Sequence, residues 1–230
     1  MANKTVGILG GMGPEATVDL MSKIIRATPA KTDQEHIRLL VDNNPQVPSR
    51  IDAILEGSEN PGPVLAEMAK GLENWGAEML AIPCNTAHYY VQYVMEAVNI
   101  PVVNMIEETI QVIVASGIKN IALLATTATL KTKLYEEKLI QAGLEVILPD
   151  PEFQEEIMRA IYGVKSGDYP KAYGAIAKVL EHVQSRGAQG VIPGCTELPL
   201  IISKDNCSLE IFDPTTILAK EIVARAYNTK

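Results

Sequence analysis

The sequence predicts an α/β fold of two similar lobes, and two observations carry this prediction. Short apolar runs alternate with longer amphipathic segments along the 230 residues, an order typical of parallel sheets flanked by helices. The alternation also runs through the chain twice, once in each half. We therefore expect two pseudo-symmetric lobes, each a mainly parallel sheet flanked by helices, related by a pseudo-twofold axis, with the active site in the cleft between them. The expected lobes are residues 1–100, completed by 212–230, and residues 101–211.

Each expected strand is a short buried run, and each expected helix has apolar residues at helical spacing. In the first half, the strands are Thr5–Leu9, Ile37–Val41, Met79–Ile82 and Val102–Val103, and the helices are Glu15–Arg26, Pro63–Trp75 and Thr86–Val98. In the second half, the strands are Ile121–Ala125, Leu144–Leu148, Gly190–Ile192 and Glu210–Phe212, and the helices are Lys131–Gln141, Glu152–Lys165, Lys171–Arg186 and Thr215–Tyr227.

An internal repeat aligns the two halves at two cysteines. Cys84 and Cys195 each lie eight residues after the glycine of a Gly-Ala pair, beyond one apolar strand, and they are 111 residues apart. Further pairs at similar separations are Val6 with Ile121 (115 residues), Val41 with Ile147 or Leu148 (about 106 residues), and Asn104 with Asp213 (109 residues).

The positions of these cysteines point to chemistry at the strand ends. Ligands of parallel α/β sheets bind beyond the carboxyl ends of the strands, where Cys84 and Cys195 are expected. Two thiols on opposite sides of a small molecule suit a reaction in which a proton leaves one face and returns to the other. A helix starting after Cys84 would lower the pKa of its thiol. Cys207, in a polar stretch, is expected to be an incidental surface residue.

Composition narrows the classes of partner. Twenty basic and 28 acidic residues give a net charge of −8, and no basic stretch interleaves with aromatic residues, so we expect no nucleic-acid partner. No apolar stretch is long enough for a membrane span, so we expect no membrane partner. Three cysteines, an odd number, argue against a disulfide framework. We expect a cytoplasmic protein with free thiols, present as a homodimer.

A glycine-rich loop and one histidine leave other readings open. Gly11, Gly13 and Ala16 fit a dinucleotide-binding pattern. Pro14 and the lack of a lone ribose-binding acid after the next strand weaken that reading, and favour a tight loop whose amides approach a small anion. His88 could pair with Cys84 as a nucleophile, although a position on a helix surface is the simpler expectation. No metal-ligand spacing is present, so we expect no metal.

Three motifs give the chain a resemblance to a known family. Cys84 lies in Pro-Cys-Asn-Thr-Ala-His, Cys195 lies in Gly-Cys-Thr-Glu-Leu, and Gly10–Pro14 reads Gly-Gly-Met-Gly-Pro. With these motifs the sequence resembles the aspartate/glutamate racemases across its whole length. The resemblance implies two α/β lobes, no pyridoxal phosphate or other cofactor, and catalysis by Cys84 and Cys195. It also implies a small acidic amino acid as substrate.

The resemblance further implies a set of substrate-binding residues. Arg50 and Lys165 correspond to the family's arginine and lysine that bind substrate carboxylates. The other expected pocket residues are Met12, Asn85, Thr86, Thr126, Thr196 and Glu197. In the implied mechanism, one cysteine removes the α-proton as a thiolate and the other protonates the opposite face. Three alternatives remain: a decarboxylase or cis–trans isomerase of the same superfamily, a single-cysteine hydrolase using Cys84 and His88, and a non-catalytic amino-acid-binding protein.

Overall fold

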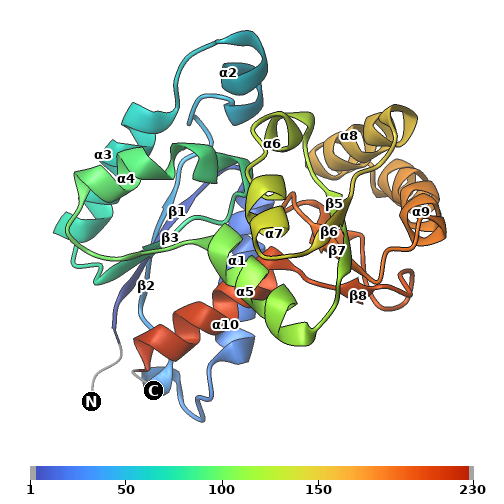
Figure 1. Ribbon diagram of the computed structural model, residues 1–230. Coiled ribbons are helices and arrows are strands. Elements are labelled where there is room, and N and C mark those ends of the chain that lie inside the picture. Colours follow the sequence, from blue (N-terminus) through green and yellow to red (C-terminus); the bar gives the residue numbers. More distant parts are fainter. Residues whose placement is uncertain (1–3, 228–230) are drawn as a thin grey trace. The chain divides into compact units, whose positions relative to one another are not determined.

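The computed structural model describes residues 4–227 and divides into two compact units (Figure 1). Unit 1 contains the described residues up to Glu108 together with those from Thr215 onward, and unit 2 is Thr109–Pro214. Each unit contains one four-stranded sheet in which every neighbouring pair of strands is parallel. The predicted α/β class with two parallel-sheet units is confirmed.

The two sheets have the same strand order. Unit 1 contains β1 (Val6–Gly10), β2 (Leu39–Asn43), β3 (Met79–Ala81) and β4 (Val102–Val103) in the order β2-β1-β3-β4. Unit 2 contains β5 (Asn120–Leu124), β6 (Glu145–Ile147), β7 (Gly190–Pro193) and β8 (Glu210–Ile211) in the order β6-β5-β7-β8. Thus β3 and β7, the strands that precede the two cysteines, occupy the same place in their sheets. The repeat predicted from the sequence is a repeat of topology.

Helices cover both faces of the sheet in unit 1. The helices that contribute to this unit are α1 (Pro14–Ala27), α2 (Arg50–Glu56), α3 (Gly62–Asn74), α4 (Val91–Ala97), the start of α5 (Met105–Ser116) and α10 (Pro214–Ala226). Successive side chains of a strand point to opposite faces. Ile8 accordingly packs in one apolar cluster with residues of α1 and α10, and Leu9 packs in another with residues of α3 and α4.

The core of unit 2 lies between its sheet and a helical hairpin. The helices after α5 are α6 (Thr127–Lys131), α7 (Glu136–Gln141), α8 (Pro151–Lys165) and α9 (Tyr169–Ser185). Ile161 of α8 and Ile176 of α9 are buried against Ala122 and Leu124 of β5. Gly167 makes the tight turn between α8 and α9 with a φ of +77°, a conformation that L side chains rarely adopt.

Several helices differ from the sequence prediction. Helix α5 was not predicted, because its Ile-Gln-Val-Ile-Val run is typical of a strand. Its start is set by Asn104, whose side-chain oxygen accepts hydrogen bonds from the amides of Ile106 and Glu107 at 3.0 and 3.3 Å. The single helix expected at 131–141 is interrupted at Lys133, which has a φ of 52°. Helix α2 was also not predicted, and the helix expected at 86–98 begins as a 3₁₀ turn (Thr86–Tyr90) before α4.

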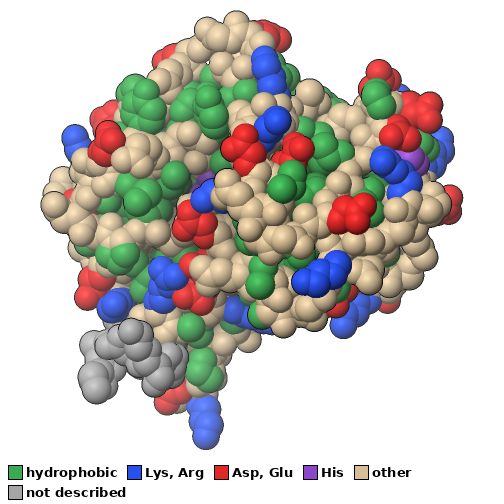
Figure 2. Space-filling model, in the orientation of Figure 1, with side chains coloured by type: hydrophobic (Ala, Val, Ile, Leu, Met, Phe, Trp, Pro, Cys, Tyr) green, Lys and Arg blue, Asp and Glu red, His purple; other side chains and the backbone are tan. Residues whose placement is uncertain are grey.

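The surface carries charges of both signs. Figure 2 shows acidic, basic and apolar side chains interspersed over the face in view. Within residues 4–227, no helix is both long enough and apolar enough to cross a membrane.

Candidate functional site

Cys84 lies just beyond the carboxyl end of β3, as predicted. Its side chain is only 6% exposed, and its amide donates a hydrogen bond to the carbonyl of Ile82 at 2.9 Å. The following turn is a five-residue 3₁₀ helix, Thr86–Tyr90. The expectation of an α-helix starting directly after Cys84 is therefore wrong, and a single 3₁₀ turn has few aligned peptide dipoles to direct at the sulfur.

His88 fixes the backbone of Cys84. Its ring is buried, with Nδ1 2.9 Å from the Cys84 carbonyl oxygen, and its Nε2 accepts a hydrogen bond from the Met105 amide at 3.2 Å. Because the amide can only donate, Nε2 carries no proton, so Nδ1 carries it and donates to Cys84. Burial lowers the pKa of His88 to about 4, which keeps the ring neutral.

This arrangement corrects two expectations about His88. The residue is in the core rather than on a helix surface. Both of its ring nitrogens are engaged by backbone groups, so neither is available to the Cys84 thiol as a base. The structure therefore does not support the Cys84–His88 pair that a single-cysteine hydrolase would need.

Arg50 begins α2 and is held by neutral oxygens. Its Nη1 donates to the carbonyls of Val47 and Pro48 at 3.0 and 2.9 Å, and its Nη2 donates to the carbonyl of Met12 at 3.4 Å. Its buried Nε has no hydrogen-bond partner among the described residues. The charge of Arg50 lowers the pKa of nearby Tyr90, although burial, the larger effect, leaves that pKa raised overall. The Arg50 guanidinium thus has an N–H donor, on Nε, that no described residue accepts.

The glycine-rich loop after β1 is packed against the end of β2. Gly11 has a φ of +90°, and a Cβ atom there would lie 2.3 Å from the backbone of Asn44. Its amide donates to the hydroxyl of Thr17 at 2.9 Å, so this amide is already used within the loop. The loop brings Met12 into the same apolar cluster as Cys84, and the carbonyl of Met12 meets Arg50.

In unit 2, Cys195 forms one chain of contacts with Glu197 and Lys165. Cys195 follows β7 and Gly194, and its thiol donates a hydrogen bond to Glu197 Oε2 at 2.9 Å. Glu197 Oε1 lies 3.4 Å from Lys165 Nζ. Cys195 and Glu197 are buried, whereas the Lys165 side chain is 35% exposed at the last residue of α8. Desolvation, followed by the Glu197 charge, raises the pKa of Cys195 well above its ordinary value, and Lys165 acts in the opposite direction.

The remaining predicted pocket residues are all buried polar side chains beside strand ends. They are Asn85, Thr86, Thr126 and Thr196. Thr126 caps α6, because its hydroxyl accepts from the amide of Thr129 at 3.1 Å. Nearby Gln154, which the sequence gave no reason to select, donates to the carbonyl of Ala125 at 3.0 Å.

Cys207 corrects another expectation. It is buried in the apolar core of unit 2 rather than exposed at the surface. The polar residues around it in the sequence form a turn, and its side chain points inward from that turn. Burial raises the pKa of its thiol. The residue has no counterpart in unit 1, consistent with a packing role.

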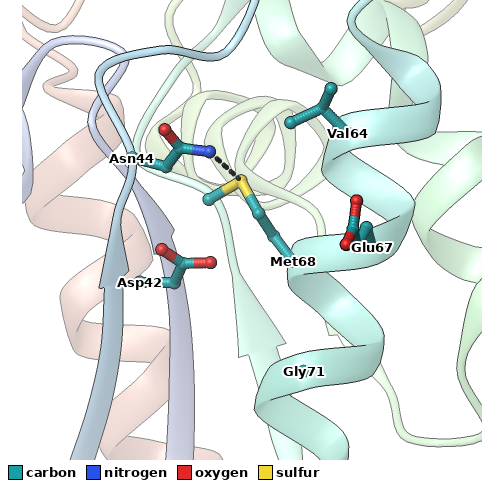
Figure 3. Close-up of a pocket in the computed structure, with 6 residues that line it drawn as sticks. All are labelled: Asp42, Asn44, Val64, Glu67, Met68 and Gly71. Carbon is teal, nitrogen blue, oxygen red and sulfur yellow. Dashed lines mark hydrogen bonds between the residues drawn. The ribbon is translucent and has the colours of Figure 1, made fainter.

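Two cavities, one on each unit, differ in charge. In unit 1 a cavity of about 360 Å³ lies between β2 and α3, with the carboxylates of Asp42 and Glu67 at its wall (Figure 3). Asn44 Nδ2 points across it toward the Met68 sulfur at 3.8 Å. A second cavity, in unit 2, is lined by three basic residues, including Lys165.

Among residues 4–227, no group of three or more His, Cys, Asp or Glu is arranged to hold a metal ion. The absence of a metal or other cofactor stays a prediction.

Comparison with known proteins identifies the family. The model of the family described as Asp/Glu/Hydantoin racemase matches residues 9–222. An aspartate racemase of Picrophilus torridus is 34% identical, with a TM-score of 0.90 over 97% of this chain and 94% of that one. An aspartate racemase homologue from Pyrococcus horikoshii is 30% identical, with a TM-score of 0.79 over 97% and 99% of the two chains. The broad specificity amino-acid racemase RacX of Bacillus subtilis is 28% identical over 223 residues, 95% of this chain and 96% of that one.

The chain therefore belongs to the Asp/Glu/hydantoin racemase family. It is an isomerase that racemises amino acids, of the type that works without pyridoxal phosphate.

Proposed function

We propose that the protein racemises an acidic amino acid, aspartate or glutamate or both, by proton transfer between Cys84, Cys195 and the substrate α-carbon. The observation that carries the proposal is the matched position of the two thiols. Each follows the third strand along its sheet, β3 or β7, and each is buried at the carboxyl end where ligands of parallel sheets bind. A single-base reaction gives no reason for the second thiol.

The contacts of Cys195 support a protonated starting state for this cysteine. Because burial and Glu197 raise the pKa of Cys195, this thiol holds its proton and is the acid in one direction of the reaction. Cys84 is then the base that removes the α-proton, and Cys195 gives its proton to the opposite face of the carbanion. In the other direction Cys195 must lose its proton first, and Glu197 Oε2, 2.9 Å away, is the acceptor.

The positive groups support the choice of an acidic substrate. The α-proton of an amino acid is a very weak acid, so the intermediate needs cations and donors around its carboxylate. Arg50 has unused donors and no carboxylate partner within residues 4–227, so it can bind one substrate carboxylate. Lys165 can bind the other while its contact with Glu197 is exchanged. A water-excluding site would strengthen both contacts.

The names of the relatives include both narrow and broad substrate specificity. The Picrophilus torridus protein is called an aspartate racemase, and RacX is called a broad specificity enzyme. The remaining pocket residues of the proposed site are those named above, Met12, Asn85, Thr86, Thr126 and Thr196. A homodimeric state and a cytoplasmic location are further parts of the proposal. Size-exclusion chromatography with light scattering tests the dimer.

Isotope exchange tests the two-cysteine mechanism. Cys84→Ser and Cys195→Ser should each abolish racemisation in D₂O, because a serine hydroxyl is too weak an acid to supply a base near neutral pH. The remaining thiol can still remove and return the proton on its own face. Each variant should therefore exchange the α-proton of one enantiomer only, and the two variants should select opposite enantiomers.

The control is Cys207→Ser, which should leave racemisation and exchange unchanged. Optical rotation follows racemisation and proton NMR follows deuterium at the α-carbon. Racemisation by either the Cys84→Ser or the Cys195→Ser protein would replace the two-base mechanism with a single-base one.

A further inference from the structure

A cationic pocket lies on unit 2, between the end of α8 and the start of α9. It is lined by Arg159, Tyr162, Gly163, Lys165, Ser166 and Lys171, and its volume is about 470 Å³. That volume falls in the range of small-molecule sites, roughly 300–1,000 Å³. Three of the six lining residues are basic and none is acidic, on a chain whose net charge is −8. Such a local excess of positive charge marks a place for an anion.

The three basic residues differ in how far their charges are already neutralised. Arg159 Nη1 donates to Glu156 Oε1 at 2.7 Å, and the other N–H groups of its guanidinium can donate to a ligand. Lys171 makes no side-chain ion pair or hydrogen bond with any described residue. Asp168, the nearest acidic residue along the chain, caps α9 by accepting from the backbone amide of Lys171 at 3.3 Å, and it does not line the pocket.

Lys165 connects this pocket to the reactive thiol. It lines the pocket, and its Nζ lies 3.4 Å from Glu197 Oε1, while Glu197 Oε2 accepts the hydrogen bond of Cys195. A distance of 3.4 Å and a side chain that is one-third exposed describe an ion pair that a competing anion can replace. A ligand in the pocket would therefore act on Cys195 through two contacts.

We propose that the cationic pocket binds a small dianion, a dicarboxylate or a phosphate group, and that the bound dianion competes with Glu197 for the Lys165 ammonium. Three positive groups, one of them without an acidic partner, favour a doubly charged ligand over a singly charged one. Tyr162, whose hydroxyl is a neutral donor, also lines the pocket. The proposal needs the contact between Lys165 and Glu197 and does not need the racemase reaction.

The direction of the effect on Cys195 follows from the charges. Lys165 favours the Cys195 thiolate, and Glu197 disfavours it. A dianion that draws Lys165 away from Glu197 removes the favourable charge and adds two negative ones nearby. The thiolate is the nucleophile in alkylation, so occupation of the pocket should slow the alkylation of Cys195.

The experiment measures alkylation of the full chain by iodoacetamide, with mass spectrometry resolving the Cys195 peptide. Inorganic phosphate and succinate are titrated separately at constant ionic strength. The rate at Cys195 should fall several-fold and reach a plateau. In Lys171→Gln and Arg159→Gln proteins, the half-effect concentration should rise at least about fivefold, the factor for one unit charge about 4 Å from one of the ligand's two charges in water-like surroundings.

The matched control is Lys178→Gln, which removes one positive charge from the same helix, α9, but from a residue that does not line the pocket. This variant should titrate like the wild-type protein. A response to phosphate alone identifies the ligand as a phosphate group, and a response to succinate alone identifies a dicarboxylate. Equal half-effect concentrations in all four proteins, or a Cys195 rate indifferent to both anions, would overturn the proposal. Succinate bound at the proposed substrate site would not depend on Arg159 or Lys171, so the response of these two variants separates this proposal from the proposed function.

Discussion

His88 should make the folded protein lose stability as the pH falls from about 6.5 to about 4. The ring is buried and neutral, with a pKa of about 4 against an ordinary value of 6.5. Between these pH values the unfolded chain binds a proton that the folded chain does not bind, so the free energy of unfolding rises with pH. The gap between the two pKa values corresponds to about 3 kcal/mol, at about 1.4 kcal/mol for each pKa unit.

The variant His88→Gln isolates this contribution, because a glutamine side chain does not titrate. At pH 7 the wild-type protein should be the more stable of the two, since it keeps both hydrogen bonds of the ring. The difference in unfolding free energy, measured by urea titration from pH 4.5 to 7.5, should shrink steadily toward acid. Parallel stability curves for wild type and His88→Gln would refute the reasoning.

Three further predictions concern the site and its loop. Arg50→Ala and Lys165→Ala should each lower kcat/KM for aspartate and glutamate by roughly 10- to 150-fold, the effect of losing a charged hydrogen bond. Arg50→Lys should also be impaired, because a point charge does not replace a planar fork; wild-type steady-state kinetics would contradict both statements. Glu197→Gln removes a charge that raises the pKa of Cys195, so the pH profile of Cys195 alkylation should move to lower pH, and an unmoved profile would exclude this coupling. Gly11→Ala should destabilise the protein by about 1–3 kcal/mol in urea titrations, because φ is +90° and Asn44 occupies the space for a Cβ atom.

The internal repeat made the fold predictable because it appears in the spacing of matched residues and does not depend on the helix or strand propensity of single residues. Gly76 and Gly187, which open the two cysteine segments, both adopt a positive φ, 106° and 88°, three residues before β3 and β7 begin. A glycine is needed at such a turn in both halves, so the sequence retains the match. Propensity failed where packing overrides it, as in α5. Its β-branched run is helical, and the signal that could have found it was Asn104 followed three residues later by Glu107.

The sequence selected candidate site residues but not their contacts. Cys84 and Cys195 were selected because each follows an apolar strand within a specific motif. The contact between Lys165 and Glu197 joins residues that are 32 positions apart, and the bond from Met105 to His88 spans 17. Only the folded chain brings such residues together, so neither the burial of His88 nor its tautomer could be read from the order of residues. The burial of Cys207 was also not predictable, because its neighbours in the sequence are polar although its own side chain is buried.

If the substrate is acidic, as proposed, the positive groups that bind it must act against the net negative charge of the chain. Screening limits the repulsion of the net −8 charge to about 8 Å at physiological ionic strength, so the groups in contact with the substrate decide binding. The two groups proposed to bind the substrate, Arg50 and Lys165, differ in their surroundings. Arg50 is held by three neutral carbonyl oxygens, so no carboxylate among these contacts competes with a ligand for its guanidinium. The Lys165 ammonium lies 3.4 Å from Glu197 Oε1, so in the proposed mechanism its availability depends on the proton that Glu197 would exchange with Cys195. On the proposed mechanism, the substrate contact of Lys165 would therefore be coupled to proton transfer, whereas that of Arg50 would not.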